Sequence, residues 1–223
     1  FTSIIKFMPV SLDLNFLPLV RQNGQDQPAW PGLYVATPPR GAARSRDIDL
    51  LALYLSIGGT APLPADQIEQ LMPRLAQVYY RSSGTATAAL KAVVDELNRF
   101  LLERNLKASN TGRQGIGLLT QAVLRGDMLY LAHSGTVQTY LIKPETTTLL
   151  VDDVGGGRGL GTSRTAGVRF FHAGLQPGDY LVLSHRPAAG WNIQTVRNQP
   201  GQGMEGPRHS LLEQAGMDPQ AVL

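Results

Sequence analysis

The sequence IGLLTQAVLRGDMLYLAHSGTVQTYLI, residues 116–142, contains two apolar runs joined by an Arg-Gly-Asp triplet centred on Gly126. A second break follows at a Ser-Gly pair that ends at Gly135. A glycine beside an aspartate or a serine, placed between β-rich runs, is typical of a hairpin turn. Both faces of the alternating pattern over residues 127–132 are largely apolar, which suits a strand covered on both sides. The stretch therefore predicts a three-strand antiparallel meander in the middle of a sandwich.

Three amphipathic patterns that precede this stretch predict helices. Residues 47–57 have apolar side chains at helical spacing and are followed by a Gly-Gly pair, which ends a helix well. Residues 65–81 form a second helical pattern, interrupted by Pro73, which predicts a kink. Residues 87–105 form a third, with one apolar face.

Short apolar runs outside these helices predict the remaining strands, and a final helical piece is expected over residues 210–215. The expected strands cover residues 4–8, 12–16, 32–37, 147–151, 167–173 and 180–185. Strands, then helices, then a long run of strands indicate an α+β fold. We expect N-terminal strands over residues 1–20 and one domain over 21–223. The absence of an initial Met and the helical pattern near the end are compatible with a piece of a longer protein.

The composition is that of a globular chain and excludes several kinds of site. With 223 residues, 43% hydrophobic, the chain can bury a sizeable core. The net charge of +3 is small and its cations are scattered, so no nucleic-acid surface is expected. The absence of Cys excludes disulfides and fits a reducing compartment, and no apolar run has the length of a membrane span or a signal peptide. We therefore expect a cytoplasmic protein.

Five features occur in an order that resembles the metal-dependent Ser/Thr protein phosphatases of type 2C, also called PPM-type. They are the run GLYVATPPRG, the two long helices, the stretch ending LYLAHSGTVQTYLI, the piece RGLGTS, and LQPGDYLVLSH. The resemblance covers roughly residues 19–223. It implies an α/β/β/α four-layer sandwich of two antiparallel sheets flanked by helices.

The resemblance also implies a pair of Mg²⁺ or Mn²⁺ ions, held by Asp carboxylates, that activate a water for attack on phosphate. By this matching, Thr37 and Pro38 stand where the family has its Asp-Gly pair, and His185 replaces the Asp of a Ser-Asp-Gly motif. Thr136 lies where the family has Gly-Asp-Ser-Arg, and Asp26 is the one carboxylate left in the early region. The closing Asp-Asn motif is not found.

One carboxylate cannot neutralise two dications, so the resemblance predicts a pseudophosphatase with no catalytic residues, no bound metal and no cofactor. We expect it to act by binding a protein partner, as a regulatory or structural module. The alternative is an active metal-dependent phosphatase with an atypical Mg²⁺ or Mn²⁺ site. A third class, a sandwich enzyme unrelated to phosphatases, also fits the strand-rich pattern.

Three other features suggest sites but are better explained as structure. His133 and His185 could bind Zn²⁺, yet two histidines without a recognised spacing are usually ordinary strand residues. The loop at 155–161, GGGRGLG, lacks the Lys-Ser/Thr of a phosphate-binding loop. The pair at 152–153, Asp-Asp, is more typical of a solvated turn than of a cation site.

Overall fold

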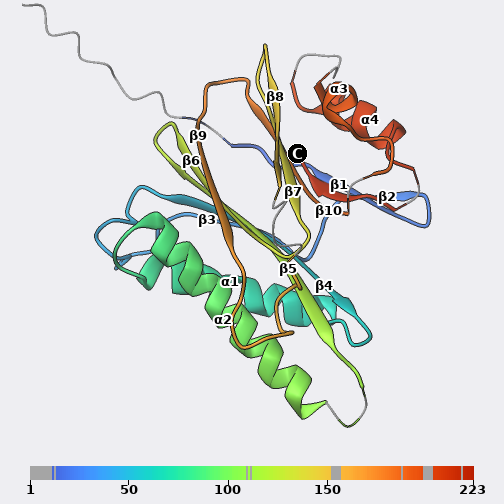
Figure 1. Cartoon of the computed structure of the whole chain (residues 1–223). Helices are drawn as coiled ribbons and strands as arrows, with labels where there is room; N and C mark the ends of the chain where they lie inside the picture. The colour runs from blue at the N-terminus through green and yellow to red at the C-terminus, as the bar shows by residue number, and fades with distance from the viewer. Residues whose placement is uncertain are drawn as a thin grey trace, which may run out of the picture.

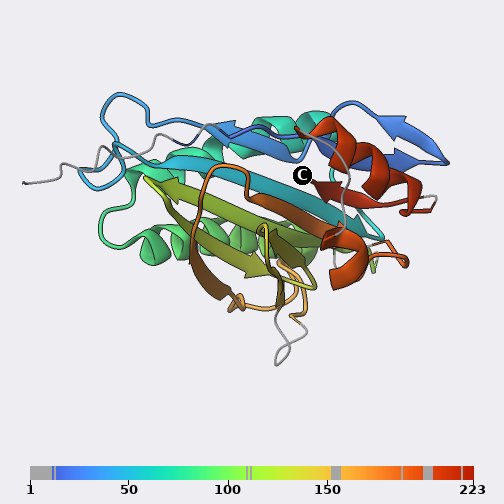
Figure 2. The ribbon, with the colours of Figure 1, turned by 90° about the horizontal axis from the view of Figure 1, so that it is seen from above.

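Two antiparallel β-sheets face each other in the computed structural model of the chain, and helices cover the outer side of each sheet (Figures 1 and 2). The structure describes residues 12, 14–108, 110, 112–151, 157–186, 188–197, 203–216 and 218–223. The expected strand at residues 4–8 lies outside these residues.

The first sheet has five strands in the order β3-β4-β5-β6-β9, and all neighbours are antiparallel. The strands are β3 (Leu33–Ala36), β4 (Leu50–Gly59), β5 (Gly115–Arg125), β6 (Met128–Ser134) and β9 (Arg169–Gly174). The second sheet has six strands in the order β2-β1-β11-β10-β7-β8. These are β1 (Pro18–Gln22), β2 (Gln25–Gln27), β7 (Gln138–Ile142), β8 (Thr147–Val151), β10 (Tyr180–Arg186) and β11 (Gln220–Val222).

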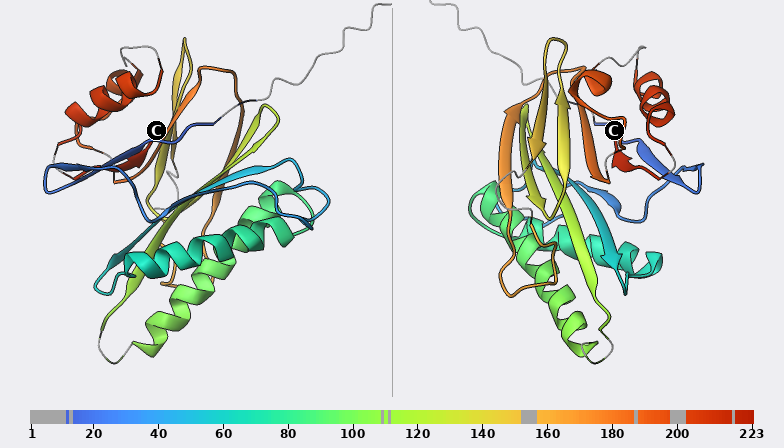
Figure 3. Two further views of the ribbon diagram at one scale, coloured as in Figure 1. Left: turned by 180° about the vertical axis from the view of Figure 1, so that it is seen from behind. Right: turned by 45° about the vertical axis from the view of Figure 1, so that its right-hand side comes forward.

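Two long helices, α1 (Ala65–Arg81) and α2 (Ala86–Lys107), lie on the five-stranded sheet, whereas α3 (Ile193–Arg197) and α4 (Glu205–Glu213) lie on the six-stranded sheet (Figure 3). The two long helices agree with the sequence-based ranges, and Pro73 is tolerated inside α1. The side chain of Thr85 caps α2 by accepting the backbone N–H of Ala88 at 3.1 Å.

Alternating side chains of β4 enter two different apolar layers. Leu51, Leu53 and Leu55 pack against α1 and α2, whereas Tyr54 faces the other sheet. A third layer lies between the six-stranded sheet and α3 and α4. The expected four-layer α/β/β/α sandwich is therefore confirmed.

The expected three-strand meander is wrong at its third strand. β5 and β6 pair as predicted, but β7 pairs with β8 and β10 in the other sheet. The connection between β6 and β7 spans three residues, and Gly135 has a φ of +90°. Because β9 already pairs with the free edge of β6, the chain crosses between the sheets here instead of forming a hairpin.

The helix expected over residues 47–57 is also wrong, because this segment is the long strand β4. Seven consecutive residues of β4, from Leu51 to Ile57, are buried. A strand covered on both faces reads as a continuous apolar run, which satisfies the helical spacing as well. Three elements that the sequence did not predict, β2, α3 and β11, are short.

The shorter predictions are mostly confirmed, with shifts at their ends. β3, β8, β9 and β10 occupy the expected regions, and the last expected helix is part of α4. The strand expected over residues 12–16 is wrong, because residues 14–17 form no strand and the first strand, β1, begins at Pro18.

A buried carboxylate connects the segment before β4 to α1 and β5. Asp49 is fully buried and accepts hydrogen bonds from Arg125 Nε at 2.7 Å and Tyr79 Oη at 2.6 Å. The guanidinium of Arg46, also fully buried, lies 3.6 Å from the same carboxylate. Removing the carboxylate would therefore leave a buried cation without its counter-charge.

We expect Asp49→Ala to lower the free energy of unfolding by about 3–5 kcal/mol, because Arg46 loses the group that compensates its burial. The exposed ion pair of Lys91 and Asp95 offers a control, and Asp95→Ala should cost no more than about 0.5 kcal/mol. Urea unfolding of the two variants and the parent measures both values. Equal losses would show that the buried cluster is not a stabilising feature.

Candidate functional site

Polar side chains from both sheets meet at one end of the sandwich, around His185. His185 belongs to β10 and is buried. Its Nδ1 lies 2.8 Å from the Ser56 hydroxyl of β4, and its Nε2 lies 3.3 Å from the Thr120 hydroxyl of β5. The ring stacks on Tyr54 with the ring centroids 4.0 Å apart. A histidine of one sheet is thus bonded to two strands of the other.

His133 makes a similar connection in the opposite direction. It lies on β6, and its Nε2 is 2.9 Å from the Thr139 hydroxyl of β7. Burial, with a smaller contribution from the nearby His133, lowers the pKa of His185 to about 3. His185 is therefore neutral at physiological pH and acts here as a hydrogen-bonding group.

A recess of about 630 Å³ opens beside His185. Its described lining contains one charged side chain, Arg186, and no carboxylate. The lining residues are Gln22, Gln27, Ala29, Trp30, Pro31, Gly32, Ser56, Ile57, Gly58, Leu63, Ala65, Ile68, Leu118, His185, Arg186 and Gln220.

The segment before β3 closes one side of this recess. The indole Nε1 of Trp30 donates to the Leu55 carbonyl oxygen at 3.1 Å. A Cβ at Gly32 would lie 1.9 Å from that oxygen, so only glycine lets the segment approach β4 so closely. The backbone of β4 is therefore covered by residues that offer no negative charge.

Thr37 and Pro38 are not part of this site, although the sequence matching placed them there. β3 ends at Ala36, which pairs with Leu51. Leu51 precedes Ser56 by five residues, which corresponds to about 17 Å along a strand. The residue that meets His185 is Ser56, so the site forms at the end of β4 and not at the end of β3.

Asp26 and Thr136 also lie outside the lining of the recess. Asp26 is on β2 and accepts Arg21 Nε at 2.7 Å, while the same guanidinium donates to the carbonyl oxygens of Leu212 and Gly216. The guanidinium of Arg21 therefore connects the β1–β2 hairpin to the segment around α4. Thr136 is exposed in the connection between β6 and β7.

Ser56 was missed because its strand was predicted to be a helix. The available signal was the Gly-Gly pair at Gly58, which follows a run that is apolar apart from Tyr54 and Ser56. Such a pair is as compatible with the end of a buried strand as with a helix terminus.

The donors at this site do not fit a pair of divalent cations. No group of three or more His, Cys, Asp or Glu that could hold a metal ion occurs in the described part of the chain. Around His185 the available ligands are two hydroxyls and a neutral imidazole, beside the cationic Arg186. Mg²⁺ and Mn²⁺ require oxygen ligands that bring negative charge.

The described part of the glycine-rich loop, residues 157–161, packs against β5. Leu160 N–H donates to the Gly117 carbonyl at 2.7 Å, and Gly117 N–H donates back at 3.0 Å. These backbone bonds support the structural interpretation of the loop. The Asp-Asp pair at 152–153 lies outside the described residues.

Among the helices that the structure describes, none combines the length and the hydrophobicity of a membrane span.

Sequence comparisons give no relative: no protein-family model matches the chain, and no curated protein matches it. Structural comparison gives clear matches. The serine/threonine phosphatase Stp1 from Staphylococcus aureus superposes with a TM-score of 0.69 over 97% of this chain and 96% of that one, at 11% identity.

Two further phosphatase structures match over nearly their whole length. The S. agalactiae serine/threonine phosphatase has a TM-score of 0.62 at 13% identity, covering 93% of this chain and 97% of that one. PppA, a regulatory component of the T6SS in Pseudomonas aeruginosa, has a TM-score of 0.60 at 13% identity, covering 93% and 95%. The chain therefore has the fold of the bacterial serine/threonine phosphatases, which confirms the type 2C resemblance at the level of the fold.

Proposed function

We propose that this chain is a catalytically inactive phosphatase-like domain, a pseudophosphatase, that acts in the cytoplasm by binding a protein partner as a regulatory or structural module. The observation that supports it is the chemistry of the recess where Ser56 meets His185. Its described lining contains Arg186 and no carboxylate.

Charge explains why such a recess should not support metal-dependent hydrolysis. Two dications brought within a few ångströms repel each other unless several anionic ligands neutralise them. Ser56 and His185 bring no negative charge, and Arg186 adds a positive one. Without bound metal nothing here lowers the pKa of a water molecule toward neutrality, because that is the role the metal would have.

A role in binding follows from what the chain retains. The chain has both sheets of the phosphatase fold, but its recess lacks the carboxylates that metal-dependent hydrolysis needs. A function of this chain would therefore depend on what its surface binds. PppA, which has the same fold, is a regulatory component of a larger system, although its sequence is only 13% identical. We therefore propose a protein as the partner.

The proposal predicts that Mn²⁺ does not bind at micromolar concentrations and that p-nitrophenyl phosphate is not hydrolysed in its presence. Isothermal titration calorimetry and a turnover assay measure the two quantities. Saturable binding with a micromolar Kd, together with Mn²⁺-dependent turnover, would overturn the proposal and support an active phosphatase with an atypical site.

A second prediction tests where the site lies. Ser56→Asp combined with His185→Asp should place two carboxylates side by side, so the variant should be less stable than the parent without metal. Mn²⁺ at 100 times its Kd should then raise the melting temperature by about 5–10 °C. The parent should not respond.

The matched control for this variant is Thr37→Asp with Pro38→Gly and His185→Asp. It adds the same number of carboxylates, but at positions that the strand register separates, so it should show no Mn²⁺-dependent shift. Equal shifts in the two variants, or a folded Ser56→Asp/His185→Asp variant without any shift, would refute the proposed position of the site.

The buried His185 also predicts how stability depends on pH. Its pKa is about 3 in the folded chain and about 6.5 when unfolded, so between these values only the unfolded state takes up the proton. The free energy of unfolding should therefore be fully retained above pH 6.5. It should fall by up to about 1.4 kcal/mol per pH unit as the pH decreases below that value.

His185→Gln should remove the contribution of His185 to the pH dependence. The difference in free energy of unfolding between the parent and the variant should therefore shrink from pH 7.5 to pH 5. Urea unfolding at both pH values measures the difference. Parallel curves for the parent and His185→Gln would contradict the assignment.

A further inference from the structure

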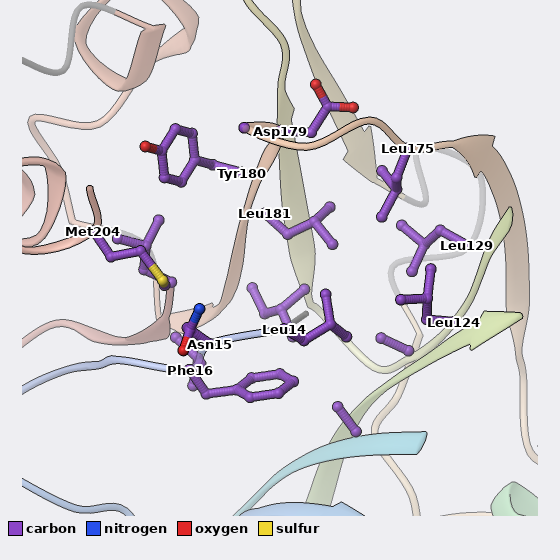
Figure 4. A pocket seen from close by; sticks show the side chains of 16 residues that line it. Leu14, Asn15, Phe16, Leu124, Leu129, Leu175, Asp179, Tyr180, Leu181 and Met204 are labelled. Carbon is purple, nitrogen blue, oxygen red and sulfur yellow. The ribbon is translucent and has the colours of Figure 1, made fainter. Parts of the chain in front are cut away.

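The two sheets enclose a second cavity, of about 240 Å³, away from the recess at His185 (Figure 4). It is lined by Ala52 of β4 and Leu181 of β10, each four residues before Ser56 and His185. Leu183 also lines the cavity and lies two residues before His185, about 7 Å along the strand, but no residue lines both spaces, so the two are distinct. The segment that contains Phe16 also lines the cavity.

Most residues that line this cavity are apolar, and the polar ones among them are Asn15, Asp179 and Tyr180. Figure 4 shows Leu124, Leu129, Leu175 and Leu181 gathered around one space, with Phe16 at its lower side. A cavity of roughly 150 Å³ lined by Leu, Ile and Phe stays dry and takes up benzene. The present cavity is larger, so it has room for a short aliphatic chain.

A basic recess of about 140 Å³ adjoins this cavity. The two share Gly178, Tyr180 and Leu223 in their linings, and the recess adds the cations Lys143 and Arg197. An apolar space and a cationic space thus lie on either side of the same three residues.

The charges of the recess are only partly neutralised. Lys143 Nζ lies 3.6 Å from the carboxylate of Asp179, which also accepts the Gln176 N–H at 3.0 Å. Arg197 donates to the Glu145 carbonyl at 2.6 Å, and no carboxylate lies within ion-pair distance of it among the residues that the structure describes. A net positive charge therefore remains beside the opening of the cavity.

We propose that the cavity and the basic recess together bind an amphipathic anion: an aliphatic chain of about eight to ten carbons with a carboxylate head. The chain would lie between the sheets against Leu129 and Leu181, where transfer from water is favourable by burial of apolar surface. The carboxylate would pair with Arg197, which supplies a planar set of N–H donors. This site is independent of the recess at His185.

Decanoate is the probe, and binding is measured by calorimetry and by the rise in melting temperature, with decanol as the uncharged analogue. Decanoate should bind saturably with one molecule per chain. Ala122→Leu should abolish binding, because the added side chain fills the cavity from β5, and Ala52→Leu does the same from β4 if the first variant fails to fold. Ala88→Leu on the exposed side of α2 should bind like the parent.

Arg197→Gln should weaken decanoate binding about tenfold and leave decanol binding unchanged, since it removes only the charged partner. Arg81→Gln, at the exposed end of α1, controls for the change in net charge and should have no effect. The proposal is overturned if the parent does not bind decanoate. It is also overturned if both cavity-filling variants bind as the parent does, or if Arg197→Gln affects the two probes equally.

Discussion

Double-sided burial of β4 and β5 constrains the rest of this structure. Most side chains on these strands enter either the layer beneath α1 and α2 or the layer between the sheets, so water reaches few of them. A polar residue here must therefore find its partner inside the protein. Ser56 and Thr120 find it in His185, which comes from the opposite sheet. Burial of β4 and β5 on both faces therefore explains why the polar side chains at this site are hydrogen-bonded to one another.

The spacing of apolar residues within a short segment was enough to predict the two long helices. The helices α1 and α2 were predicted almost to their ends, because a one-sided apolar stripe marks a helix in the sequence itself. The pattern failed for β4, where burial on both faces removes the alternation that identifies a strand. It also failed for β7, because the choice between two sheets depends on β9 and β10, which follow later in the chain.

The site could be predicted only in part, for a related reason. His185 was expected in a strand, and it lies near the end of β10 and lines the recess. Its partner was assigned to Thr37, since β3 was taken as the strand that leads into the site. Only the pairing of β3 with β4 shows that Ser56 occupies that place, and such pairing between distant segments leaves no mark in a single sequence.

The position of β11 affects how the molecule can form during synthesis. This strand is made of residues 220–222, yet it lies between β10 and the early strand β1, residues 18–22. The five-stranded sheet and its two helices are complete once β9 has left the ribosome. The hairpin of β1 and β2 cannot join its sheet until β11 emerges, so it must wait as an unpaired edge. A nascent chain therefore carries an exposed strand while the residues between β2 and β11 are made, a state prone to non-native pairing.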